Sequence, residues 1–277
     1  MECMINDLPI YYEEHGQGKA ILCLHGFTED HRSMLACLEP FFRNTFQGIE
    51  KYRRIYLDMP GMGKTPVRDW VKNADVMLDI LKKFISEVIG DEGFLLVGTS
   101  YGGYMALGLV LDESIKVDGV FLFGPCTVTN FEDRILPEVE DEDLYIEDGL
   151  EDAHEDNDDF DDFLDVAVVA TEKIWRRYEN EILPAYKIVD ADFTDQYRKN
   201  GYTFSFEHEL KEIQFAKPMT IIVGRQDESV GYEDAWNMLK HLPRLTYVAL
   251  DFAGHLLHLE HEEVFNLHLR EWLKAAK

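Results

Sequence analysis

A serine stands where the sequence favours a nucleophile, in the run Gly98-Thr99-Ser100-Tyr101-Gly102. An apolar, strand-like run at residues 94–97 precedes it, and a helical pattern at residues 101–111 follows. A sharp turn between a buried strand and a helix lifts the serine hydroxyl above the edge of a sheet, and the small flanking residues let neighbouring backbones pass. The helix also directs its N-terminal N–H dipoles at that hydroxyl. We therefore expect Ser100 to act as a nucleophile.

A serine of ordinary basicity needs a base, and the base needs a group that orients it. Asp227 and His255 each lie in a loop that follows an apolar run, and they come after Ser100 in the order acid, then histidine. We expect His255 to accept and return the proton, and Asp227 to hold the imidazole and stabilise its cation. Glu228 beside Asp227, and Asp251 four residues before His255, are alternatives for the acid.

An acyl-transfer site also needs backbone donors for the negative charge that develops on the carbonyl oxygen. The residue after the nucleophile, Tyr101, is expected to supply one N–H. The second N–H is expected from Phe27, in the loop His25-Gly26-Phe27 that follows the apolar run at residues 20–24. His25, Cys126 and Trp175 are further candidates for the lining of the substrate pocket.

The elements that must position these residues follow an alternating pattern in most of the chain. Strand patterns lie at residues 2–5, 10–14, 20–24, 54–57, 94–97, 117–123, 219–223 and 246–250, and helical patterns lie at 31–42, 74–89, 101–111, 232–240 and 262–274. Such alternation predicts an α/β fold with a mostly parallel central sheet flanked by helices. Residues 125–215 lack this rhythm and are mostly helical. We therefore expect a core of residues 1–124 and 216–277, with an acidic helical cap, or lid, at 125–215.

The acidic charge is concentrated in this predicted cap. Residues 132–165 hold 18 acidic residues and one basic residue, Arg134. Apolar residues from Phe160 to Val168 recur at helical spacing, so we expect helices with acidic outer faces rather than a disordered tail. Calcium binding and recruitment of a cationic substrate are the alternatives, although no window fits an EF-hand loop. Near the mouth of a pocket, these charges would favour neutral or cationic substrates.

Composition excludes several classes of protein. The 277 residues carry 54 acidic and 27 basic side chains, a net charge of −27, which argues against nucleic acid and anionic membranes as partners. No apolar run reaches the roughly 18 residues of a membrane span, and the N-terminal residues do not resemble a secretory signal. The four cysteines form no CxxC pair, so reduced thiols and a cytoplasmic location are expected.

Taken together, these motifs resemble the α/β-hydrolase-fold serine hydrolases that carry a cap. The matching positions are His25-Gly26-Phe27, then Asp58, Pro60, Gly61 and Gly63, then Gly98, Ser100 and Gly102, then Asp227, and finally Gly254 and His255. The branch with this pattern includes small carboxylesterases, carbon–carbon bond hydrolases and proline iminopeptidase-like enzymes. The resemblance implies a serine hydrolase, most simply a carboxylesterase, that cleaves a small ester, amide or carbon–carbon substrate through an acyl-enzyme. It implies no cofactor, and the substrate is not carried over because caps differ between members.

Two other functions remain open at this stage. A cofactor-free perhydrolase, or haloperoxidase-like enzyme, would use the same three residues, and a non-catalytic ligand-binding protein can share the fold. A metal site built from His255, His258, His261 and Glu260 is not expected, because no HExxH motif is present and His255 is needed as the base. The oligomeric state is not predicted.

Overall fold

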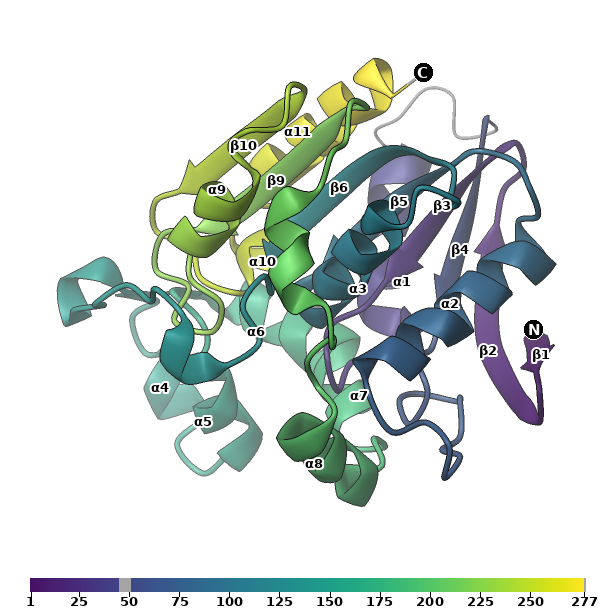
Figure 1. Ribbon diagram of the computed structural model, residues 1–277. Helices are drawn as coiled ribbons and strands as arrows, with labels where there is room; N and C mark the ends of the chain where they lie inside the picture. The colour runs from purple at the N-terminus through teal and green to yellow at the C-terminus, as the bar shows by residue number, and fades with distance from the viewer. Residues whose placement is uncertain (45–50, 277) are drawn as a thin grey trace.

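The computed structural model describes residues 1–44 and 51–276, and their centre is one mixed sheet (Figure 1). The described strands, in the order in which they lie side by side, are β1 (Glu2–Ile5), β2 (Leu8–His15), β4 (Tyr52–Leu57), β3 (Lys19–Leu24), β5 (Phe94–Thr99), β6 (Val117–Pro125), β9 (Met219–Gly224) and β10 (Leu245–Leu250). The pairs β1–β2 and β2–β4 are antiparallel, and the other neighbours are parallel. The predicted mostly parallel sheet is thus confirmed.

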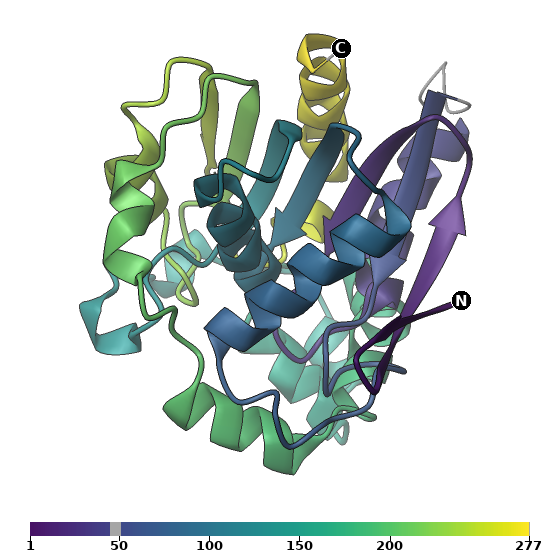
Figure 2. The ribbon, with the colours of Figure 1, turned by 45° about the vertical axis from the view of Figure 1, so that its right-hand side comes forward.

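Helices cover both faces of the sheet (Figures 1 and 2). On one face lie α2 (Ala74–Val88), α3 (Ser100–Leu111) and α9 (Glu233–Leu239), and on the other lie α1 (His31–Asn44) and α11 (Glu262–Ala275). Strand β3 shows why both faces are needed. Leu22 and Leu24 pack into the first cluster, and Ile21 and Cys23 into the second, so its apolar run is buried on both sides.

A long segment is inserted between β6 and β9, and it lies across the edge of the sheet where the parallel strands end (Figures 1 and 2). We call residues 126–218 the inserted segment. Its elements are η2 (Phe131–Asp133), η3 (Asp141–Asp143), β7 (Tyr145–Ile146), α4 (Leu150–Ala153), α5 (Asp158–Leu164), β8 (Val169–Ala170), α6 (Glu172–Glu181), α7 (Leu183–Tyr186), α8 (Ala191–Asn200) and η4 (Glu207–Glu212). The expected helices are present, and the short parallel pair β7–β8 is an addition to them.

The inserted segment has a hydrophobic cluster of its own. Trp175 is fully buried at its centre and contacts Phe160, Phe163 and Tyr178. The cluster is completed by Leu256 and Leu259, which lie at or next to α10 (Leu257–Glu260), after the last strand. Most acidic side chains of residues 132–165 are exposed, as expected for acidic outer faces. This cluster therefore joins the inserted segment to the loop that contains His255.

A second contact joins the end of the inserted segment to α3. The hydroxyls of Tyr101 and Tyr197 lie 2.8 Å apart. The ring of Tyr202 stacks on that of Tyr101, with centroids 4.2 Å apart. One turn further along α3, the Tyr104 hydroxyl accepts the backbone N–H of Phe204 at 2.8 Å. Residues 197–204 thus pack directly above the turn that carries Ser100.

Among the described residues, no helix has both the length and the apolar character needed to cross a membrane. The proposed boundaries of the core and the cap, at residues 125 and 215, fall at the last residue of β6 and a few residues before β9. The division into these two units stays a prediction.

Candidate active site

Ser100 lies on the sharp turn between β5 and α3. Its φ is 48°, a left-handed conformation that a residue with a side chain rarely adopts. The turn also requires glycines. A Cβ on Gly98 would lie 2.7 Å from the carbonyl oxygen of Gly102, and one on Gly102 would lie 2.3 Å from that of Leu24. The strained conformation raises Ser100 above the sheet edge and onto the wall of a cavity.

Asp227 and His255 form a close acid–base pair in the loops after β9 and β10. The Nδ1 atom of His255 lies 2.8 Å from Oδ2 of Asp227. Asp227 is fully buried, and its other oxygen, Oδ1, accepts the backbone N–H groups of Ser229 at 2.9 Å and Val230 at 3.0 Å. Because both oxygens are held, the carboxylate fixes the ring of His255 with its Nε2 free to face the cavity.

The pKa of His255 reflects two opposed effects. Burial on its own lowers the pKa, because it disfavours the charged ring. The charge of Asp227 and its hydrogen bond raise the pKa and outweigh the burial, so the pKa of His255 lies above its ordinary value. Asp227 therefore stabilises the imidazolium that would form when His255 takes a proton.

Gly124 leaves the space that the acid–base pair occupies. It lies near the end of β6 with a φ of 48°. A Cβ at this position would lie 3.3 Å from Nδ1 of His255 and 3.5 Å from Oδ2 of Asp227. Sequence reasoning missed this residue, although the dipeptide Gly124-Pro125 at the end of an apolar run was a visible signal of unusual backbone geometry.

The two other candidates for the acid are exposed to solvent. Glu228 is exposed to solvent. Asp251 is also exposed, and its Oδ1 accepts Nε2 of Gln226 at 3.2 Å. The geometry favours Asp227 over both.

The backbone N–H groups of Phe27 and Tyr101 are available as donors. Within the described part of the chain, neither N–H is engaged by a protein acceptor. Phe27 lines the same cavity as Ser100, and its ring contacts that of Tyr101 with centroids 5.4 Å apart. Tyr101 opens the first turn of α3, where the positive end of the helix dipole lies. Their role as the two oxyanion donors stays a prediction.

His25 supports this loop from behind. Its Nε2 accepts the N–H of Met59 at 3.0 Å, which leaves Nδ1 to donate to the carbonyl oxygen of Gly26, 2.7 Å away. His25 is fully buried. It therefore fixes the backbone next to Phe27 and does not reach the cavity.

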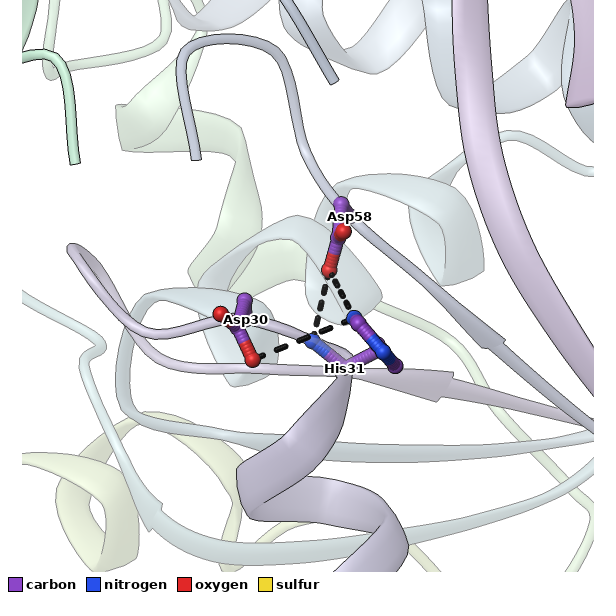
Figure 3. Close-up of side chains that lie close together, drawn as sticks. All are labelled: Asp30, His31 and Asp58. Atoms are coloured by element: carbon purple, nitrogen blue, oxygen red, sulfur yellow. Dashed lines mark hydrogen bonds and ion pairs between the residues drawn. The ribbon is translucent and has the colours of Figure 1, made fainter. Parts of the chain in front are cut away.

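A buried cluster of Asp30, His31 and Asp58 lies beside this loop (Figure 3). Its atoms are close enough to hold a metal ion, but they are engaged with one another and with their neighbours. Oδ1 of Asp58 accepts both the N–H and Nδ1 of His31, at 2.7 and 2.8 Å, and Oδ2 accepts the N–H of Lys64 at 2.8 Å. Both oxygens of Asp30 accept the guanidinium of Arg32. The cluster is therefore better explained as a hydrogen-bonded support than as a metal site.

Ser100, His255 and Phe27 all line one cavity of about 680 Å³, bordered by the inserted segment. This is the volume range of sites for small organic molecules. Ser100, His255 and Phe27 thus meet at one cavity, with Asp227 paired to His255 and Tyr101 directly after Ser100. An acyl-transfer site needs a nucleophile, an oriented base and N–H donors of this kind.

Comparison with known proteins identifies the family to which the chain belongs. The profile of the alpha/beta hydrolase family matches residues 21–267. The chain belongs to the alpha/beta hydrolase family. A crystal structure of an alpha/beta superfamily hydrolase from Oenococcus oeni PSU-1 is 32% identical, covers 96% of both chains and superimposes with a TM-score of 0.88. The fold predicted from the sequence is thereby confirmed, and the protein is a hydrolase of this family.

Two curated relatives differ in their substrates. A pimeloyl-[acyl-carrier protein] methyl ester esterase of Legionella pneumophila (strain Paris) is 24% identical over 286 residues, which cover 96% of this chain and 99% of the relative. A 2-hydroxy-6-oxononadienedioate/2-hydroxy-6-oxononatrienedioate hydrolase of Paraburkholderia phymatum is 25% identical over 276 residues, covering 96% and 91%. Ester hydrolysis and a second hydrolytic chemistry are both represented among relatives of this alpha/beta hydrolase.

The three further pocket candidates do not lie on the cavity of this alpha/beta hydrolase. His25 is behind the loop of Phe27, as described above. Cys126 is 1% exposed and donates its N–H to the carbonyl oxygen of Ser100 at 3.0 Å, so it supports the nucleophile turn from below. Burial raises the pKa of its thiol to about 12. Trp175 belongs to the core of the inserted segment. All three are placed by packing rather than by contact with a ligand.

Glu260 has a supporting role that the sequence did not show. Its Oε2 accepts the N–H of Gly254 at 2.7 Å, and its Oε1 accepts those of Val168 and Val169 at 2.8 and 3.2 Å. Gly254 directly precedes His255. Glu260 thus fastens the histidine loop of the alpha/beta hydrolase to strand β8 of the inserted segment, instead of ligating a metal.

Proposed function

We propose that this alpha/beta hydrolase is a serine hydrolase, a carboxylesterase in the simplest case, in which Ser100, His255 and Asp227 form the catalytic triad. One observation carries the proposal. His255 lines the same cavity as a strained Ser100, and its Nδ1 lies 2.8 Å from the Asp227 carboxylate, which accepts two further N–H groups. Backbone strain is found mainly at functional sites, and a nucleophilic serine needs an oriented base nearby. Ser100 has both features.

The reaction begins when Oγ of Ser100 attacks the carbonyl carbon of the ester. Nε2 of His255 takes the hydroxyl proton, and the carbonyl electron pair becomes an oxyanion held by the N–H groups of Phe27 and Tyr101. The C–O bond to the alcohol then breaks, and His255 returns its proton to the leaving oxygen. This step leaves an acyl group on Ser100.

Water completes the cycle. His255 removes a proton from a water molecule, whose oxygen attacks the acyl carbon. The second tetrahedral intermediate collapses with transfer of that proton to Oγ of Ser100, and the carboxylic acid leaves. An amide or an activated carbon–carbon bond would pass through the same two stages. The printed activity of the Legionella relative makes an ester the first substrate to test.

The test uses a fluorophosphonate probe together with a panel of p-nitrophenyl esters of increasing chain length. We expect the probe to label the wild-type protein and not the Ser100→Ala variant. We also expect Ser100→Ala to lose ester turnover by at least about 10³-fold. The melting temperature of the variant should be close to that of the wild type or above it, because the substitution removes a hydroxyl and leaves the fold in place. Retained turnover in a purified, folded Ser100→Ala protein would refute the assignment of Ser100 as the nucleophile.

A further inference from the structure

The charges that line the cavity have the opposite balance to those of the whole protein. The chain holds 54 acidic and 27 basic residues. In the part of the chain that the structure describes, the cavity is lined by the basic residues Arg134, Arg198 and Lys199, and by one acidic residue, Glu29. None of the acidic residues of 132–165 whose side chains the structure describes lines the cavity, whereas the single basic residue of the same stretch, Arg134, does.

Arg134 is a fixed positive charge at this wall. Its guanidinium donates to the carbonyl oxygens of Val128 at 2.8 Å, Ser229 at 2.5 Å and Thr129 at 3.0 Å. These acceptors hold the side chain in place, but they are neutral. The positive charge is therefore oriented and not cancelled by a carboxylate contact.

Arg198 is the more accessible cation. It lies near the end of α8, and its guanidinium carbon is 5.0 Å from the centre of the Phe27 ring. Among the described residues it has no hydrogen bond and no ion pair, although acids outnumber bases two to one in this chain. Phe27 supplies one of the two proposed oxyanion donors, so Arg198 and the proposed oxyanion site border the same cavity. A planar guanidinium suits a carboxylate with two parallel hydrogen bonds.

Glu29 opposes these charges only in part. Its Oε2 accepts the hydroxyl of Ser33 at 2.6 Å and faces the N–H of Gly26. Glu29 lies two residues after Phe27, and in the part of the chain that the structure describes no ion pair joins it to Arg198. The cavity as a whole keeps more positive than negative charge.

We infer that the substrates of this hydrolase are small esters that carry a carboxylate at the far end of the acyl chain, and that Arg198 is the residue that recognises this carboxylate. This inference rests on the proposed function and names its substrate class. It reverses the preference for neutral or cationic compounds that the acidic segment suggested from the sequence, because most of the acidic side chains described in that segment are exposed to solvent and none of them lines the cavity.

The test compares three methyl esters of six-carbon acids that differ in the charge of the far end: monomethyl adipate, methyl hexanoate and methyl 6-aminohexanoate. Methanol release gives kcat and KM for each. We expect kcat/KM to be highest for the anion and lowest for the cation. We expect the ratio of kcat/KM for the anionic ester to kcat/KM for the cationic ester to decrease as the salt concentration is raised, because screening weakens attraction between partly exposed charges.

Variants assign the effect to one residue. Arg198→Gln should raise KM for monomethyl adipate by about ten-fold and leave methyl hexanoate nearly unchanged. Arg198→Lys should recover part of the loss, because it keeps the charge and loses the planar pair of donors. The matched control is Arg225→Gln. Arg225 also lies over an aromatic ring, 5.7 Å from the centre of Tyr232, but it is outside the cavity.

A binding measurement separates this inference from the proposed function. Calorimetric titration of Ser100→Ala with monomethyl adipate needs no turnover, and the double variant with Arg198→Gln should bind about ten-fold more weakly. Ester hydrolysis without any preference for the anion, unchanged in Arg198→Gln, would overturn the inference and leave the serine hydrolase intact. Absence of turnover and of labelling would overturn the proposed function. In that case equal binding in the two variants would overturn the inference as well, and weaker binding in the double variant would support it.

Discussion

Glu260 provides a sharp test of how the inserted segment positions the catalytic base. Its carboxylate accepts three backbone N–H groups, one next to His255 and two in or beside β8. In Glu260→Gln one of the two oxygen positions becomes an NH₂ group, which cannot accept a hydrogen bond. If that group faces Val168 and Val169, two donors lose their acceptor. If it faces Gly254, only one does, so we expect the amide to take this second orientation.

The structure sets the size of the effect. A buried backbone donor without an acceptor costs about 1–3 kcal/mol. The substitution also removes the cost of burying an ionised carboxylate, a burial that raises the pKa of Glu260 above its ordinary value. We therefore expect a loss near the lower end, about 1–2 kcal/mol, which corresponds to about 2–4 °C in Tm for each kcal/mol in a chain of this size.

The assay measures Tm and, well below it, the kcat of ester hydrolysis. Glu260→Ala removes every acceptor and should lower both quantities further than Glu260→Gln. Glu263→Gln, an exposed carboxylate on the following helix, should lower neither. Because the orphaned donor in Glu260→Gln lies next to His255, its kcat should fall while its KM changes little. Wild-type Tm and kcat in Glu260→Ala would refute the reasoning.

Two further predictions concern the acid–base pair. The proposed mechanism needs neutral His255, whose pKa is raised above 6.5, so kcat/KM should increase with pH and reach half its maximum above that value. In Asp227→Asn the burial that lowers the pKa of His255 remains, whereas the charge that raises this pKa is gone. The midpoint of the pH profile should therefore move to lower pH, and kcat should fall by about 10³-fold or more. An unchanged midpoint would contradict this role of Asp227. Gly124→Ala should lose about ten-fold or more in kcat, because its Cβ would lie 3.3 Å from Nδ1 of His255. Gly90→Ala is the matched control, because Gly90 has a φ of 80° and no atom lies within 4 Å of a Cβ at this position. This variant should lose about 1 kcal/mol of stability and no activity. Equal kcat in the two variants would show that contact with the His255–Asp227 pair is irrelevant.

Local patterns were enough to predict the framework. The buried strands β3 and β5 are uninterrupted apolar runs, and the glycine pattern around Ser100 marks a turn whose geometry is set within five residues. Asp227 lies three residues after the buried strand β9, and His255 lies five residues after β10. Once the parallel order of the strands is inferred, their loops must meet at one edge of the sheet. These features depend on short stretches of sequence, so local residue patterns are enough to predict them.

Features set by distant contacts could not be predicted in this way. Strands β7 and β8 have two residues each, too few to show an alternating pattern. Glu260 meets Val168, 92 positions away in the sequence. Trp175 looks the same in a sequence whether it lines a pocket or fills a core. The unpaired state of Arg198 depends on which acidic side chains lie beside it, and the sequence gives only their number.

The insertion between β6 and β9 also sets the order in which the protein acquires its activity during synthesis. Ser100 and both proposed oxyanion donors belong to the first half of the chain, whereas the proposed acid and base follow β9 and β10. Ser100 is synthesised more than a hundred residues before His255. The nascent chain therefore carries Ser100 without its proposed base until β9 has paired with β6 and β10 with β9, so hydrolysis would be the last property that folding confers.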